Sequence, residues 1–527
     1  MTDASIKRAL CQGPVCPARS TARAHAPQLG ALALVLTIAG CAVGPDFKPP
    51  TAPTVNRYTE APSPALTASA PGMGGAAQRL VPGADIPTEW WSAFQSPEID
   101  RLVREALAHS PSLGAAQATL RQARETLRAT EGELLAPNVS GSVQGARERT
   151  AVSGPGPSSG AVILNTLNAT VSVSYNVDVF GGARRQIEAS QAQLQFQKEQ
   201  VEATYLTLTA NVVTTALREA SLRAQLKATE DIAAVQERSL DIVRKQFSVG
   251  AVARATVLQQ QTQLATTRAT IPGLEKQLAQ TRNQLAILIG RMPSEAELPT
   301  ITLESLTLPI DLPVSLPSSL VRQRPDVRAS EAQLHQASAQ VGVATANLYP
   351  HFDITADYGV SGASLSHLLN PAHRVWSLAG GLTAPIFNGG QLSAERRAAV
   401  AAYDAAWQQY RGTVLQAFQN VADTLAALDT DARTLAADAE ADALARETLE
   451  LTQGQYRLGA VNYLTLLVVQ QQYDQAHTAL VQAQAQRFTD TATLFQALGG
   501  GWWNRPQPLA EVTGAPAGAD IDNRQLQ

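Results

Sequence analysis

Two long stretches without helix breakers dominate this sequence. The first, Ala183 to Phe247, contains no Pro and no Gly and is rich in Ala, Leu, Gln, Glu and Arg, which favour helix. At 1.5 Å per residue, one unbroken helix over this stretch would be about 98 Å long. The second, Gln391 to Arg457, also lacks Pro, and its only glycines are Gly412 and Gly454. An average helix has about 12 residues, so these two rods predict an elongated, mainly α protein.

Segments of strict polar–apolar alternation precede each rod. In one of them Val171, Val173 and Tyr175 alternate with Ser and Asn residues, which is the period of two expected of a strand with two different faces. About ten residues suffice to cross a bilayer as a tilted strand. A half-buried sheet in a soluble protein would show the same alternation. The strands are expected at about 138–148, 170–180, 351–361 and 375–387.

The plan of the chain occurs twice. Gly250-Ala251-Val252 after the first rod matches Gly459-Ala460-Val461 after the second. At the same offset the matching pairs are Thr256 with Thr465, Leu258 with Leu467, Gln261 with Gln470, Leu285 with Leu494 and Gly290 with Gly499. This internal duplication predicts two tandem repeats, each helix-strand-strand-long helix-helix.

The N-terminus has the pattern of a lipoprotein signal peptide. A basic segment is followed by the apolar run Leu29 to Ala39, which is too short to span a bilayer, and Ile38-Ala39-Gly40 precedes Cys41. The pattern predicts cleavage before Cys41 and lipidation of that residue, whose several acyl chains would tether it firmly. An ordinary signal peptide or an uncleaved anchor with an incidental Cys is the alternative. Ala42, rather than Asp, at the next position resembles lipoproteins exported to the outer membrane.

These patterns divide the chain into segments. Residues 42–89 are rich in Pro, Ala, Gly and Ser, which is typical of an extended linker. The expected division is a signal peptide at 1–40, a lipid anchor and linker at 41–89, a first repeat at 90–300, a connector at 301–318, a second repeat at 319–501 and a disordered tail at 502–527.

Four strands in one chain raise the question of how a sheet in a membrane closes. An open edge in lipid would leave backbone amides unpaired, so other subunits have to complete the ring. Eight strands make a filled barrel, whereas twelve leave room for a lumen. Three chains would therefore form a trimer with a 12-stranded β-barrel joined to a 12-column α-barrel, in which two shorter helices stacked end to end match each rod.

Composition excludes several functions. The net charge is −4 and basic residues form no stripe, so nucleic acid is not an expected partner. Cys11 and Cys16 would leave with the signal peptide and Cys41 would be acylated, so the mature chain has no disulfide and no Cys-based metal site. The seven His are scattered, and neither a phosphate loop nor a nucleophile–base set is visible. We expect no enzyme activity, no cofactor and no metal.

Several motifs together resemble one known family. They are Cys41 with Gly44-Pro45-Asp46-Phe47, Trp90-Trp91 with Phe94, Arg324-Pro325-Asp326-Val327 with Glu331, Gly342-Val343-Ala344 with Leu348-Tyr349-Pro350, Phe387-Asn388-Gly389-Gly390, and Gly459-Ala460-Val461-Asn462-Tyr463-Leu464. In this order, over residues 41–501, they resemble the outer membrane factor (TolC-like) family, specifically the NodT-type lipoprotein branch of RND-type efflux systems.

The resemblance implies a function and a location. It implies a homotrimer in the cell outer membrane, held by outer-membrane lipid and with a long periplasmic part. Such a trimer is the channel of a tripartite efflux system and passively conducts small molecules exported by an inner-membrane RND transporter through a periplasmic adaptor (membrane fusion) protein. The alternatives are a lipid-anchored coiled-coil scaffold or adaptor lipoprotein of the cell envelope, and a hydrolase or binding lipoprotein.

The same resemblance points to residues at the far periplasmic end. The adaptor-contact tip would be Val249, Gly250, Ala251, Leu458, Gly459 and Ala460, although a Gly in a helix C-cap explains the same pattern. Tyr456 stands where the family has a gate tyrosine, and Asp241, Arg244, Arg254 and Arg457 either add ion pairs or form a solvated face. The family often has acidic residues after the tip glycine. This chain has Thr256, Thr465 and Val468 there instead, so neither cation selectivity nor the usual gate contacts can be transferred from the family.

Overall fold

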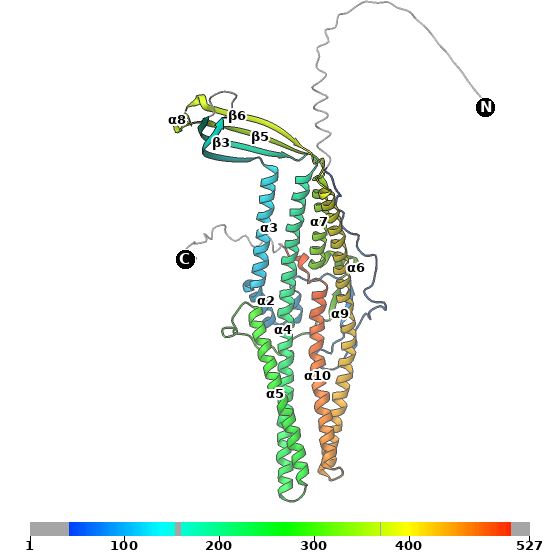
Figure 1. Cartoon of the computed structure of the whole chain (residues 1–527). Helices are drawn as coiled ribbons and strands as arrows, with labels where there is room; N and C mark the ends of the chain where they lie inside the picture. The colour runs from blue at the N-terminus through cyan, green and yellow to red at the C-terminus, as the bar shows by residue number, and fades with distance from the viewer. Residues whose placement is uncertain (1–41, 153–159, 369, 507–527) are drawn as a thin grey trace, which may run out of the picture.

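A computed structural model describes residues 42–152, 160–368 and 370–506. The predicted signal peptide, the lipidation residue Cys41 and residues 507–527 lie outside the described residues. The described chain forms a long helical body with a strand sheet at one end and two helical hairpins at the other (Figure 1).

The elements follow the predicted order in both halves of the chain. They are β1 (Arg79–Pro82), η1 (Trp90–Phe94), α2 (Pro97–His109), α3 (Pro111–Leu135), β2 (Asn138–Val152), β3 (Gly160–Val177), α4 (Gly182–Ser248), α5 (Arg254–Leu288), η2 (Leu303–Ser305), β4 (Asp311–Val314), α6 (Pro317–Gln323), α7 (Pro325–Ala346), β5 (His351–Gly362), α8 (Leu365–Leu368), η3 (Pro371–His373), β6 (Arg374–Thr383), α9 (Gln391–Arg457), α10 (Tyr463–Ala497) and η4 (Trp502–Asn504).

The two rods are helices α4 and α9, each 67 residues long. Both follow a glycine in the left-handed region, Gly181 at φ 82° and Gly390 at φ 84°, where other residues are strained. The carboxylate of Asp178 accepts hydrogen bonds from the backbone N–H of Ala183 and Arg184, at 3.2 and 3.0 Å. It satisfies two of the four free N–H groups at the start of α4.

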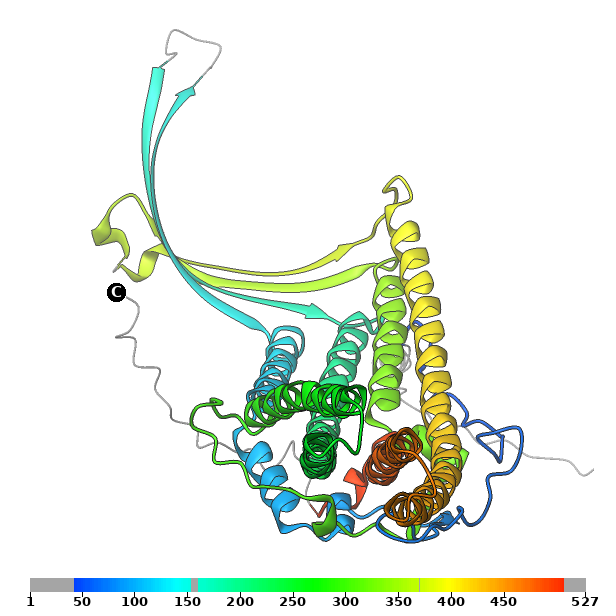
Figure 2. The same ribbon diagram turned by 90° about the horizontal axis from the view of Figure 1, so that it is seen from below.

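The shorter helices stack beside the rods. Helices α3 and α5 pack on α4, α7 packs on α4 and α9, and α10 packs on α9 and α4. Seen from the hairpin end, they stand in a row, with the sheet extending over one side of it (Figure 2). Two glycines at equivalent positions of the repeats allow the shorter helices to meet end to end. A Cβ at Gly290, after α5, would collide with the carbonyl of His109 at the end of α2. A Cβ at Gly499, after α10, would lie 2.8 Å from the carbonyl oxygen of Gln323 at the end of α6.

A compact apolar core lies halfway along the body. Its largest members, Trp90, Trp91 and Phe94, are at most 2% exposed, and Trp90 stacks on Phe495 with ring centroids 5.4 Å apart. The core joins η1, α2, α4 and α10 with the segments around η2 and α6. We call this region the belt. It holds the two halves of the chain together where the shorter helices meet end to end.

The belt also contains segments that the sequence predicted to be linkers. β1, in the predicted linker 41–89, pairs in parallel with β4, in the predicted connector 301–318, and Arg79 lies opposite Asp311 with their ion pair at 2.8 Å. The predicted tail 502–527 is ordered in its first residues, since the indole of Trp502 donates to the carbonyl of Gln323 at 2.6 Å. Each strand or turn here is completed by a partner far away in sequence, which local composition does not reveal.

Candidate functional site

The four-stranded sheet has one apolar and one polar face. The strand order is β2-β3-β5-β6, antiparallel throughout. The register places Val173 beside Ala356 and Ala356 beside Leu378, so that apolar side chains line up across three strands. These side chains are exposed, with Trp376 at 77%, Leu378 at 70% and Val143 at 79%. An exposed apolar surface of this kind marks an interaction with lipid or protein.

The opposite face carries hydroxyls, amides and carboxylates. Asp357 lies between two serines and accepts hydrogen bonds from Ser172 Oγ at 2.6 Å and Ser377 Oγ at 2.9 Å. Asp353 lies against Gly381, where any Cβ would collide with the carboxylate. Among the described strand residues of this face, the charged ones are Glu148, Asp353 and Asp357. The face is polar and acidic.

The sheet is open at both sides. Within the described residues, the outer edges of β2 and β6 pair with no other strand. Each edge presents unpaired N–H and C=O groups, which are a template for another chain.

At the opposite end of the molecule, the predicted tip residues form two equivalent turns. Val249 and Leu458 are 79% and 87% exposed. Gly250 at φ 80° and Gly459 at φ 74° close the helices in the left-handed conformation. The next residues complete the caps, with Ala251 N bonded to Gln246 O at 2.8 Å, and Ala460 N bonded to Gln455 O at 2.9 Å. The glycines are helix caps, and the caps present a large apolar side chain to solvent.

Tyr456, the predicted gate residue, joins the two hairpins. Its hydroxyl donates to Gln246 Oε1 on α4 at 2.9 Å, and its ring meets that of Tyr463 edge-on, with centroids 5.5 Å apart. Tyr463 on α10 donates to Gln260 Oε1 on α5 at 2.6 Å. The structure therefore places Tyr456 at a contact between the α4–α5 and α9–α10 hairpins.

The contact continues as a ladder of polar side chains that the sequence did not reveal. Gln260 Nε2 donates to the carbonyl of Gln236 at 3.0 Å, and Gln236 Nε2 donates to Asp474 Oδ2 at 2.9 Å. Gln236 and Gln260 are fully buried, and burial raises the pKa of Asp474 to about 6. We call Gln236, Gln246, Gln260, Tyr456, Tyr463 and Asp474 the hairpin ladder. The sequence gives no signal for the ladder, because these Gln residues have the same local pattern as Gln residues that face water.

The other charged residues near the tip do not bridge the hairpins. Asp241 and Arg244 form a 3.6 Å pair within α4, and both are more than half exposed. Arg457 donates to the carbonyl of Gln453 in its own helix. In α10, Thr465 lies in the first turn, where its N–H bonds to the Asn462 side chain at 2.9 Å. These residues form a solvated face.

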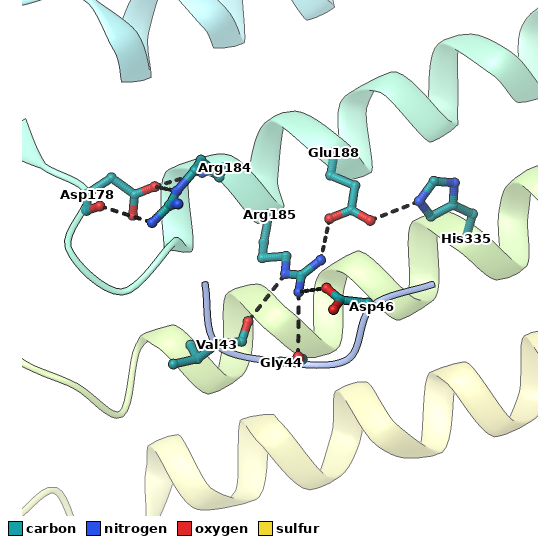
Figure 3. A network of polar contacts seen from close by, with 8 residues as sticks. All are labelled: Val43, Gly44, Asp46, Asp178, Arg184, Arg185, Glu188 and His335. Carbon is teal, nitrogen blue, oxygen red and sulfur yellow. Dashed lines mark hydrogen bonds and ion pairs between the residues drawn. The ribbon is translucent and has the colours of Figure 1, made fainter. Parts of the chain in front are cut away.

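A third region lies near the sheet. The sequence motif Gly44-Pro45-Asp46-Phe47 belongs to it but did not predict a binding site there. Residues Ala42–Phe47, which we call the strap, lie across α4 and α7 just below the strands, and Arg185 is at the centre of their contacts (Figure 3). Arg185 donates to the carbonyls of Val43 and Gly44 and to the carboxylate of Asp46.

Within residues 42–152, 160–368 and 370–506, no group of three or more His, Cys, Asp or Glu could hold a metal ion.

None of the described helices is long and apolar enough to span a bilayer.

Comparison with known proteins gives the family. The model of the outer membrane efflux protein family matches residues 102–291 and 316–500. The pyoverdine export outer membrane protein OpmQ of Pseudomonas aeruginosa is 32% identical over 428 residues, covering 80% of this chain and 89% of OpmQ. The toluene efflux pump outer membrane protein TtgC of Pseudomonas putida is 28% identical, covering 89% of this chain and 94% of TtgC.

The fold is also similar to that of solved outer-membrane channels. The outer-membrane channel OprN has a TM-score of 0.78 and 25% identity, covering 88% of this chain and all of that one. The sequence-based family assignment is confirmed, and with it the efflux role, the outer-membrane location and the absence of enzyme activity. The chain belongs to the outer membrane efflux protein family.

Proposed function

We propose that this protein is the outer-membrane channel of a tripartite efflux system. Three copies close the sheet into a 12-stranded β-barrel, continued by a 12-column α-barrel through the periplasm. Small molecules exported by an inner-membrane RND transporter enter through a periplasmic adaptor and cross the channel passively. The channel itself supplies no energy. The observation that carries the proposal is the sheet with two faces of opposite polarity and two unpaired edges.

The physical reason is that each feature of the sheet needs a specific neighbour. The apolar face needs lipid, the polar face needs water, and the edges need further strands, because lipid offers no hydrogen bonds. A ring of three copies around a water-filled lumen supplies all three. A lipid-anchored scaffold, the alternative function, would leave Trp376 and Leu378 exposed to water.

Conductance separates the channel from the scaffold. We expect the purified full-length protein to run as a heat-modifiable trimer and to give discrete current steps in planar bilayers. A scaffold would show neither behaviour. If the protein stayed monomeric and left the bilayer electrically silent, the channel proposal would be wrong.

The hairpin tips are proposed as the adaptor contact, and the hairpin ladder with Tyr456 as the closed gate. Leu458→Asp replaces an 87% exposed apolar side chain at the tip. Burial of one such side chain stabilises a contact by about 1.5–3 kcal/mol. We therefore expect the amount of adaptor that co-purifies with the tagged trimer to fall about tenfold or more. Ile310→Asp, at an exposed belt position, is the control and is expected to leave co-purification unchanged. Equal yields from the two variants would exclude the tip as a contact.

The lipid anchor is also part of this proposal. The backbone N–H of Val43 bonds to the carbonyl of Phe180 at 3.0 Å, just after β3 ends at Val177. A lipid on Cys41 would therefore enter the bilayer at the periplasmic rim of the sheet, in the leaflet that faces the helical body.

A further inference from the structure

The strap binds to the body through specific polar contacts centred on Arg185. The Arg185 side chain is only 7% exposed, and its Nη2 contacts Asp46 Oδ1 at 2.6 Å, while its Nη1 contacts Glu188 Oε2 at 2.7 Å. Its Nε donates to the carbonyl of Val43 at 3.3 Å. A guanidinium taken out of water costs several kcal/mol unless its donors are satisfied. The strap supplies most of the partners, so it completes the site.

The shapes on the two sides are also matched. Gly44 at φ 98° lies against Gly342 of α7, and a Cβ at Gly44 would collide with the Gly342 backbone. A Cβ at Gly342 would lie 2.7 Å from Arg185 Cγ, so both glycines are needed for the close approach. Gly181 meets the other end of the strap, where a Cβ would lie 2.6 Å from Ala42 Cα.

An aromatic contact closes the far end of the site. The ring of Phe47 stacks on His335 of α7, with centroids 4.3 Å apart and an interplanar angle of 11°. His335 Nε2 lies 2.9 Å from Glu188 Oε1, so the same carboxylate holds both Arg185 and His335 (Figure 3). The strap is thus fixed at Ala42, Gly44, Asp46 and Phe47.

We propose that Arg185 is a positioning residue for membrane insertion: it clamps the strap so that the acyl anchor on Cys41 is held at the periplasmic rim of the sheet. This inference rests on the proposed lipidation and channel function. The acyl chains then enter the membrane directly beside the strands that must insert, and the anchor acts on the sheet at high effective concentration.

The next contacts along the chain set the length of the tether that would carry the anchor without the clamp. Beyond the strap, the next hydrogen bond along the chain from the N-terminal segment to the body is Tyr58 Oη to the carbonyl of Ser315, at 2.8 Å. Ala52, which precedes Tyr58, also packs against the apolar core. A strap freed as far as Ala52 would leave the anchor on a segment with a reach of about 20 Å. Its effective concentration at the sheet rim falls steeply with the length of such a tether.

The test is a double-mutant cycle on the full chain. One arm is exported and acylated. The other carries a non-lipoprotein signal peptide, so that the mature chain begins at Ala42. Each arm is made with Arg185 and with Arg185→Gln, and the rate at which heat-modifiable trimer appears in the outer membrane is measured by pulse-chase. We expect Arg185→Gln to slow the acylated arm about tenfold and to leave the unacylated arm nearly unchanged.

Further variants keep the result interpretable. Asp46→Asn removes a strap ligand whose side chain is 87% exposed and should slow only the acylated arm, by a smaller factor. Arg128→Gln, which breaks an exposed pair with Glu125, is the control and should slow neither arm. Hydrogen exchange at the Val43 N–H should quicken in Arg185→Gln and Asp46→Asn alone.

The outcomes are distinct. Equal slowing of both arms by Arg185→Gln and Asp46→Asn would show that the clamp only stabilises the fold. No slowing in either arm would show that the strap contacts have no effect on assembly. Each result overturns the proposal. Absence of trimers or of conductance in the unmutated chain would instead refute the channel function.

Discussion

Leu378→Arg is expected to abolish assembly in the outer membrane. Leu378 is 70% exposed on the apolar face, in the middle of β6 and opposite Ala356 of β5. Arginine at the midplane of a membrane barrel costs about 2–4 kcal/mol, and three copies would bring the cost to about 6–12 kcal/mol per trimer. The measurement is the fraction of protein recovered as heat-modifiable trimer from outer membranes.

The neighbouring residue provides the control. Ala379 points to the polar face, where it lies opposite Thr355. Ala379→Arg places the same side chain one position away on the water-facing side, and trimer yield is expected to stay near that of the unmutated protein. If both variants lost the trimer equally, or if neither did, the assignment of the two faces would be wrong.

The second large effect concerns ion selectivity. The double variant Asp353→Asn, Asp357→Asn should lower the cation-to-anion permeability ratio about fivefold or more in planar bilayers under a KCl gradient. In the proposed trimer these residues would form two rings of three carboxylates in a narrow, water-filled barrel, whose low-dielectric wall would strengthen their field. On this face, the described strand residues include no Lys or Arg that would neutralise them.

The tip positions that are often acidic in the family carry no charge in this chain, so they add nothing to the field of the sheet carboxylates. The positions after the tip glycines hold Thr256, Thr465 and Val468 instead. Glu304→Gln, which removes an exposed carboxylate in the belt, is the control and should leave the reversal potential unchanged. A reversal potential that stays constant in the sheet variant would place the selectivity outside the barrel.

The sequence alone was informative where local repetition carries the structure. The rods were expected at 183–247 and 391–457 and occur at Gly182–Ser248 and Gln391–Arg457. A long run of helix formers with no Pro and few or no Gly favours a continuous helix over such a length. The strand faces also followed from the alternation. β3, however, begins at Gly160 rather than near residue 170, because its outer part lacks the strict alternation that was used to find it.

The candidate site was only partly visible. The tip glycines and Tyr456 could be named from their place in the motif, and the structure puts them at the far end of the hairpins. The partners of Tyr456 could not, because Gln246 lies 210 positions away in the chain. A Gln in a long helix has the same local pattern whether it is buried in a ladder or faces water.

The sequence by itself determined the order of the elements, the length of the rods and the polarity of the two sheet faces, because each depends on residues that are near neighbours in the chain. Only the tertiary structure decided that β1 pairs with β4, that the strap binds Arg185 and that a polar ladder joins the hairpins. Those contacts join residues more than a hundred positions apart, and their energy depends on burial and geometry that exist only once the chain has folded.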